Sequence, residues 1–226
     1  MASTDTGFGK VKLFNDFNCP VVDETNDILV GAENSSTEAI STANGGVFRL
    51  TTGATDGNRA AFSTSLNYQA DGGLLIGEAR IKSVTAITIR AYFIGFTDVV
   101  PSGTLENPIE MSGTTLTSTA DDAVGFMYDT DSTNDTWYGV GVKAGADAVP
   151  VNTGVAPAAA GTYQTLRVEV NADGNARFFI DGKYEGSVSS AVTASTALCF
   201  IVMMETRSAA TKVLDTDYIY VEMSRT

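Results

Sequence analysis

The sequence predicts an all-β protein built as an antiparallel β-sandwich. Short segments in which apolar and polar residues alternate recur from one end of the chain to the other, a pattern typical of half-buried strands. Clusters of Gly, Asn, Asp, Ser and Thr separate these segments, and no stretch shows the periodicity of an amphipathic helix. A chain of 226 residues can form one such domain, because sandwiches of this size often fold as single units.

The alternating segments define the expected strands in chain order. They cover residues 11–17, 47–51, 59–63, 74–83, 87–96, 123–128, 136–142, a meander within 163–186, 197–207 and 217–223. Three of these segments, 74–82, 87–96 and 198–204, also contain continuous apolar stretches, which are typical of strands covered on both faces. We therefore expect these three to be central strands.

The most specific element is the meander YQTLRVEVNADGNARFFIDGKYEG. Leu166, Val168 and Val170 are apolar and alternate with polar residues, as in a strand with one buried face. The Asp-Gly pairs at 173–174 and 181–182 tolerate positive φ, which tight hairpin turns require. Three consecutive antiparallel strands are therefore expected here.

Three segments rich in turn formers predict long surface loops within a single domain spanning residues 1–226. They lie near residues 18–46, 97–122 and 144–161, where periodicity is weak. Functional residues are often carried by loops of this kind, because a rigid scaffold positions them at the surface.

Composition and charge exclude several classes of function. The chain is 43% apolar and 18% charged, which is enough apolar material for a core. Its formal net charge of −13 argues against binding nucleic acid or an anionic membrane, since both need clustered Lys and Arg. No apolar run is long enough to span a bilayer, and the N-terminus lacks the pattern of a secretory signal, so we expect cytoplasmic synthesis.

The scarcity of reactive residues also restricts the chemistry. The sequence contains no histidine, which removes the usual nucleophile triads and imidazole metal ligands. Its two cysteines, Cys19 and Cys199, lie in segments that a sandwich can bring together, but without a signal peptide the expected state is two buried free thiols. Two cysteines and no histidine are too few ligands for a structural zinc site.

Several motifs along the chain together resemble the concanavalin A-like lectin and glucanase jelly roll, including laminin-G-like domains. They are FNDF (14–17), VGFMYD (124–129), YQTLRVEVNADGNARFFIDGKYEGSV (163–188), ALCFIVMMETR (197–207) and DTDYIYVEM (215–223). The resemblance implies two facing, curved antiparallel sheets. It further implies a concave face that binds glycans in the lectins and cleaves them in the glucanases, although fold alone does not carry function across.

The catalytic motif of the glucanases is absent from this sequence. Those enzymes use Glu-x-Asp-x-Glu on one strand, because alternation then places three carboxylates on one face and hydrolysis needs a carboxyl pair. No glutamate here has that spacing: Glu169 is followed by Asn171 and Asp173, and Glu106 by Pro108 and Glu110. The sequence therefore predicts a protein that is not an enzyme.

Two weaker candidate sites lie in and directly after one acidic segment. Asp129, Asp131 and Asp135 are alternating oxygen ligands of the kind that Ca²⁺ prefers, although the segment lacks the glycine and glutamate of a known calcium loop. The alternative is a solvated acidic turn with no cofactor. Trp137 and Tyr138 follow, as a candidate carbohydrate-binding platform or, alternatively, as residues of which one faces the core.

Two functional hypotheses follow. The first is a non-enzymatic virion structural protein, a capsid decoration or cement protein of a tailed bacteriophage, because the chain resembles such proteins in its small-residue loops, single jelly roll and acidic balance. It would sit on the virion surface, contact the major capsid protein or other virion proteins and self-associate, for example as a trimer. The alternative is a lectin-like carbohydrate-binding module for surface attachment.

Overall fold

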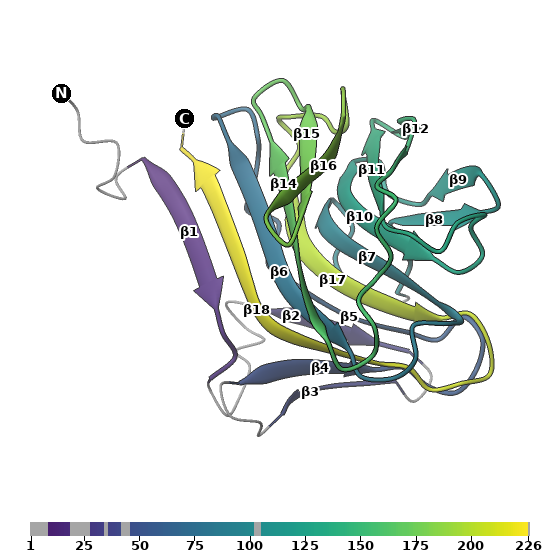
Figure 1. Ribbon diagram of the computed structural model, residues 1–226. Coiled ribbons are helices and arrows are strands. Elements are labelled where there is room, and N and C mark those ends of the chain that lie inside the picture. Colours follow the sequence, from purple (N-terminus) through teal and green to yellow (C-terminus); the bar gives the residue numbers. More distant parts are fainter. Residues whose placement is uncertain (1–8, 19–27, 34–35, 42–45, 102–104, 226) are drawn as a thin grey trace.

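The computed structural model describes residues 9–18, 28–33, 36–41, 46–101 and 105–225. All regular elements in these ranges are β-strands, and two large antiparallel sheets face each other to form a sandwich (Figure 1). The same ranges contain no helix that is suited in length and hydropathy to crossing a membrane.

Sheet A contains both ends of the described chain and the predicted meander. Its strands, in spatial order, are β16 (Lys183–Val188), β15 (Ala176–Ile180), β14 (Tyr163–Val170), β6 (Leu75–Ser83), β18 (Val213–Ser224), β4 (Val47–Thr51) and β3 (Thr37–Ser41), with β1 (Lys10–Asn15) paired to β18. The meander β14–β15–β16 therefore forms one edge of this sheet.

Sheet B lies opposite. Its strands, in spatial order, are β12 (Ala146–Asp147), β11 (Tyr138–Lys143), β10 (Ala123–Asp129), β7 (Arg90–Thr97), β17 (Cys199–Thr206), β5 (Arg59–Ser63) and β2 (Leu29–Ala32), with β13 (Val151–Asn152) paired to β11. A separate hairpin of β8 (Ile109–Ser112) and β9 (Thr115–Ser118) lies beyond β10, on the side away from sheet A (Figure 1).

The main hydrophobic core fills the space between the two sheets. Its largest members are aromatic, and all are at most 1% exposed: Phe48, Phe62, Tyr92, Phe96, Phe126, Tyr128, Trp137, Phe178 and Phe200. Burial of each such side chain contributes about 1.5–3 kcal/mol. The strict alternation of β14 explains how sheet A reaches this core, since Leu166, Val168 and Val170 are buried while the residues between them are half-buried.

The turn chemistry of the meander is confirmed. Asp181 and Gly182 both have positive φ, 50° and 79°, which is the conformation that joins β15 to β16 by a tight hairpin. Gly174 has a φ of 77° in the preceding turn. A bulge between Phe178 and Phe179 shifts the register of the second hairpin.

The predicted strands agree with the observed ones, and the central positions expected for β6, β7 and β17 are confirmed. Two expected boundaries are wrong by three residues or more. β7 begins at Arg90 rather than at residue 87, because Ile89 adopts a left-handed φ of 60° that ends regular pairing, and β18 begins at Val213 rather than at residue 217. The three segments predicted as loops also contain short strands, namely β2, β3, β8, β9, β12 and β13. Their few residues alternate too weakly to be detected as strands.

Candidate functional site

The outer face of sheet B, turned away from the main core, is here called the sheet B face. One row of directly opposed residues crosses four strands of it: Asp129 on β10, Ala91 on β7, Glu205 on β17 and Arg59 on β5. The next row is apolar and consists of Met127, Phe93, Met203 and Ala61. The registers of four strands thus place two carboxylates and a guanidinium beside an apolar strip.

The β8–β9 hairpin and the chain leading to it cover this face. Ile109 and Met111 on β8 are each 2% exposed, and Leu105 before them is also buried. They pack on the apolar strip and form a second hydrophobic core, separate from the core between the sheets. The sheet B face is therefore a closed layer of the protein and not an open groove.

The two carboxylates on the sheet B face are held by arginines. Arg207 lies 2.5 Å from Asp129 (Nη2 to Oδ2) and 2.5 Å from Glu205 (Nη1 to Oε1). Arg59 donates from Nε to Glu205 Oε2 at 2.6 Å. Asp129 and Glu205 have exposed fractions of only 0% and 1%, so the contacts replace the water that each carboxylate loses on burial.

The hairpin contributes further partners to this ion-pair network. Glu110 on β8 lies 3.3 Å from Arg59 and 3.7 Å from Arg207, while the Asn107 side-chain amide donates to Glu205. The backbone N–H of Met111 donates to Asp129 Oδ2 at 3.3 Å. The cover is therefore fixed to the sheet by charged hydrogen bonds as well as by apolar contacts.

Burial has the largest effect on the pKa values of Asp129 and Glu205. It raises the pKa of both Asp129 and Glu205 above the usual carboxyl values, and the neighbouring arginines oppose this rise. A raised pKa in a covered site can mark a catalytic acid, but a general acid must reach its substrate. Both carboxylates here are covered by the hairpin and occupied by guanidinium groups.

The candidate calcium ligands are not brought together by the structure. Asp129 is fully buried and bound to Arg207, whereas Asp131 and Asp135 are exposed. Asp131 lies 3.7 Å from Arg207 Nε, at the rim of the same ion-pair network. Across the described ranges, no three acidic or cysteine side chains are arranged to hold a metal ion. In this structure the acidic segment provides Asp129 and Asp131 as ion-pair partners of Arg207.

The rings of Trp137 and Tyr138 are both buried, which agrees with the alternative of core residues and not with an exposed sugar platform. Trp137 is 0% exposed, stacks on Tyr92 with ring centroids 5.9 Å apart, and donates from Nε1 to Gln164 Oε1 at 2.8 Å. Tyr138 is 6% exposed and packs in the second core. Neither ring can stack on a sugar from solvent, because both faces of β11 are covered.

Cys199 lies on the sheet B face and is fully buried as a free thiol. Its Sγ lies 3.3 Å from the carbonyl oxygens of both Thr97 and Val99, which are the two acceptors available to its single proton. Burial raises the pKa of the thiol to about 12. Such a thiol is inert at neutral pH. The predicted state of Cys19 lies outside the described residues.

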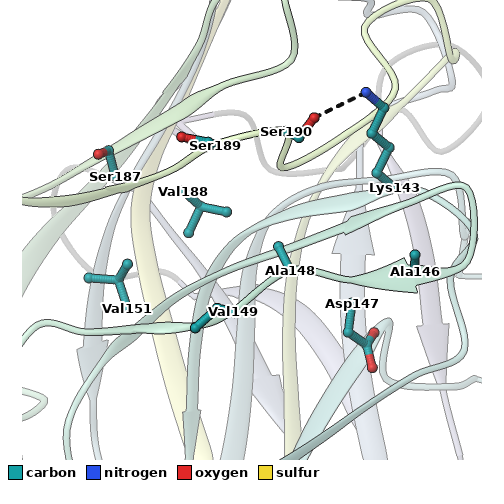
Figure 2. A pocket seen from close by; sticks show the side chains of 10 residues that line it. All are labelled: Lys143, Ala146, Asp147, Ala148, Val149, Val151, Ser187, Val188, Ser189 and Ser190. Atoms are coloured by element: carbon teal, nitrogen blue, oxygen red, sulfur yellow. Dashed lines mark hydrogen bonds between the residues drawn. The ribbon is translucent and has the colours of Figure 1, made fainter.

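An open site lies at the edge where β16 of sheet A packs beside β11 and β13 of sheet B. A pocket of ≈ 660 Å³ lies between the end of β16 and the segment that carries β12 and β13 (Figure 2). It is lined by Lys143, Ala146, Asp147, Ala148, Val149, Val151, Ser187, Val188, Ser189 and Ser190. The lining combines a small apolar floor with hydroxyl groups and one charge of each sign.

A second pocket of ≈ 290 Å³ lies on the other side of β16. Its lining is more polar and consists of Leu74, Glu169, Asn171, Asn175, Ala176, Arg177, Tyr184, Ser187, Val188 and Ser189. The two pockets share residues 187–189, and together they are called the β16 site. Tyr184 presents an aromatic ring that is 51% exposed at this site.

The turn beside the β16 site is held rigidly by asparagine side chains. Asn171 Oδ1 accepts from the backbone N–H groups of Asp173 and Asn175, and Asn175 Oδ1 accepts from Ser190 N at 2.8 Å.

Gly186 has a φ of 154°, and a Cβ there would lie 2.6 Å from Val151, so a glycine lets the two sheet edges approach. The sequence predicts β11 and the meander strands of this region, but neither β12 and β13 nor the site between them.

Comparisons with known proteins agree on the fold. No known family matches the sequence, and no curated protein matches it either. Among solved structures, a protein of unknown function from Shewanella oneidensis MR-1 is similar over 96% of this chain and 87% of its own, with a TM-score of 0.64 and 13% identity. The Emp47p carbohydrate recognition domain is similar over 95% of both chains, with a TM-score of 0.62 and 13% identity.

A Bacillus licheniformis β-glucanase is similar over 95% of this chain and 98% of its own, with a TM-score of 0.62 and 12% identity. The fold is the concanavalin A-like jelly roll. Similar jelly rolls thus include both a carbohydrate recognition domain and a glucanase. At these identities the comparisons establish the fold, and the activity must be argued from the residues of this chain.

Proposed function

We propose that this chain is a non-catalytic, lectin-like carbohydrate-binding protein whose ligand occupies the β16 site. The observation that carries the proposal is the pair of adjoining open pockets beside an exposed tyrosine ring. Their lining offers the hydroxyl of Ser187 and the side-chain NH₂ groups of Asn171 and Asn175, which can donate to sugar hydroxyls while the Oδ1 atoms of both asparagines hold the turn. Tyr184 supplies an apolar face on which a sugar ring can stack.

The absence of catalysis is proposed from the placement of the carboxylates. Glycoside hydrolysis requires two carboxyl groups that flank the scissile bond. Each pocket of the β16 site has one carboxylate, Asp147 or Glu169. Glu169 is in addition paired with Arg167 at 2.5 Å, and the pair on the sheet B face is buried beneath the β8–β9 hairpin. The carbohydrate recognition domain among the similar structures supports a binding role on this fold.

A glycan array probed with the purified chain tests this proposal. We expect binding to a restricted set of glycans, and Tyr184→Ala should weaken it about tenfold, because one stacking contact contributes about 1 kcal/mol or slightly more. Phe14→Ala is the matched control, since Phe14 is 62% exposed on β1 and lies outside the lining of both pockets. No binding to any glycan would refute the proposal, and binding unchanged in Tyr184→Ala would move the site elsewhere.

A second candidate function, attachment to the surface of a phage capsid, is supported by the outer face of sheet A. Aromatic rings and arginines gather there, as they do at protein interfaces. Phe14 contacts Tyr218 with ring centroids 5.6 Å apart, and Arg80 lies 4.1 Å over the ring of Tyr163. The partner would be the major capsid protein. Purified virions that contain the chain in fixed stoichiometry would support this role, and virions that lack it would refute it.

A further inference from the structure

The basic residues divide sharply by their partners. Most lysines and arginines pair with carboxylates in this acidic protein. Those that form no ion pair with another described residue are Arg90, Lys143, Arg177, Lys212 and Arg225. Arg90 and Lys212 are buried, and Arg225 lies at the end of the described chain. The remaining two, Lys143 and Arg177, line the two pockets of the β16 site.

Lys143 lies at one end of the first pocket, where its side chain reaches toward Ser190 (Figure 2). Its Nζ lies 3.2 Å from Ser190 Oγ across the pocket, while the carboxylate of Asp147 points the other way (Figure 2). The ammonium group therefore has one neutral hydrogen-bond partner and can donate further hydrogen bonds to a ligand. Its charge is not compensated by the acidic residue of the same pocket.

Arg177 is the cation in the lining of the second pocket that forms no ion pair with another described residue. It stands opposite Glu169 in the β14–β15 register, but the carboxylate of Glu169 is taken by Arg167, which donates to it at 2.9 Å and 2.5 Å. Arg177 is exposed and keeps its guanidinium fork open to solvent. Such a fork matches the geometry of a carboxylate or sulfate group.

The charge of the whole chain limits the density of charge on the ligand. A net charge of −13 repels a dense polyanion, and only two unpaired cations are available at the site to offset that repulsion. An oligosaccharide with a negative group on only some of its sugars is repelled less than a dense polyanion, and it still has acidic groups for the two cations to bind. Its hydroxyls would bind the serines and asparagines, and its acidic groups would bind Lys143 and Arg177.

We propose that the β16 site selects acidic oligosaccharides, those with carboxylate or sulfate groups at intervals along the chain. This inference rests on the proposed carbohydrate-binding function and adds the class of ligand. It assigns Lys143 and Arg177 as the residues that determine the preference for charge.

An array of matched oligosaccharides tests the inference. Each uronic-acid oligosaccharide is printed beside the same chain with its carboxyl groups reduced to alcohols, and each sulfated one beside its desulfated form. We expect the acidic members to give the signal, and Lys143→Gln/Arg177→Gln to reduce it about tenfold or more, because two charge-assisted hydrogen bonds are lost. The two sets of pairs show whether carboxylate or sulfate is preferred. The signal should also fall between about 0.05 M and about 0.5 M salt.

The matched control is Lys183→Gln/Arg225→Gln, which removes the same charge from two exposed residues outside the pocket linings and should leave binding unchanged. Neutral members that bind as well as acidic ones, or an unaffected pocket variant, would overturn the inference and leave the binding function standing. No binding to any member would refute the function itself. A single-stranded DNA oligonucleotide that binds as tightly as the acidic sugars would also overturn the inference, since it would show an unselective anion site.

Discussion

The sheet B face and the β16 site use the same kinds of residue in opposite ways. On the sheet B face, Arg59 and Arg207 are committed to buried carboxylates, and a hairpin closes over them. At the β16 site, Lys143 and Arg177 have no ion-pair partner in the described chain, and both pockets are open. On the sheet B face the charged side chains stabilise the fold through ion pairs. At the β16 site the two cations remain available to a ligand.

The comparison shows why charged residues alone do not mark a functional site. A buried carboxylate with a raised pKa is a common property of catalytic groups, but it also arises wherever an ion pair is sealed inside a fold. Asp129 and Glu205 belong to the second case, because both are buried and both are hydrogen-bonded to Arg207. Accessibility separates the two cases.

Removing a cation from each region should produce the largest contrast. Arg207→Met leaves Asp129 and Glu205 buried with fewer partners, so we expect the free energy of unfolding to fall by about 3–5 kcal/mol. Arg177→Met removes an exposed guanidinium and should change it by less than about 0.5 kcal/mol. Urea denaturation of both variants measures the difference. Equal midpoints for the two variants would contradict the structural role assigned to Arg207.

Truncating an apolar residue in each region should give the next largest contrast. Met111 on β8 is 2% exposed in the second core, so Met111→Ala should destabilise the protein by about 2–3 kcal/mol. Val149 in the first pocket is 86% exposed, and Val149→Ala should have an effect within about 0.5 kcal/mol. An unchanged urea midpoint for Met111→Ala would show that the hairpin does not seal the sheet B face in solution.

Most strands of the two sheets were predictable because alternation is local information. β4 and β5 have the bounds that the sequence predicts, and the Asp-Gly turns of the meander follow from the φ values that those residues tolerate. The β8–β9 hairpin was missed because its strands have four residues each and it packs on a sheet instead of joining it. A hairpin that short gives little periodic signal.

The sites were less predictable because they depend on partners distant in sequence. Asp129 and Arg207 are 78 residues apart and meet only through the registers of β10, β7 and β17. For Trp137 and Tyr138 the sequence leaves a sugar platform and a core position open, because alternation cannot reveal that both side chains are covered. The β16 site joins the edges of two sheets, and nothing in the local sequence indicates which edges meet.

Acid should partly rescue the Arg207→Met variant, and this is the smallest of the three effects. Burial already raises the pKa of Asp129 and Glu205, and loss of Arg207 removes a partner that lowers both. A carboxyl whose pKa in the folded state exceeds its unfolded value destabilises the fold at high pH. That cost declines as the pH falls toward the unfolded value, near 4.

We therefore expect the stability deficit of Arg207→Met relative to wild type to shrink by about 1–3 kcal/mol between about pH 7.5 and about pH 5. Each carboxylate that is protonated only in the folded state contributes about 1.4 kcal/mol per pH unit. Urea midpoints of wild type and variant at several pH values measure this change. Met111→Ala is the matched control, because its deficit arises from lost packing in the same covered layer and should not depend on pH. A deficit of Arg207→Met that is constant with pH would show that the two carboxylates are hydrated, and the sheet B face would then be open.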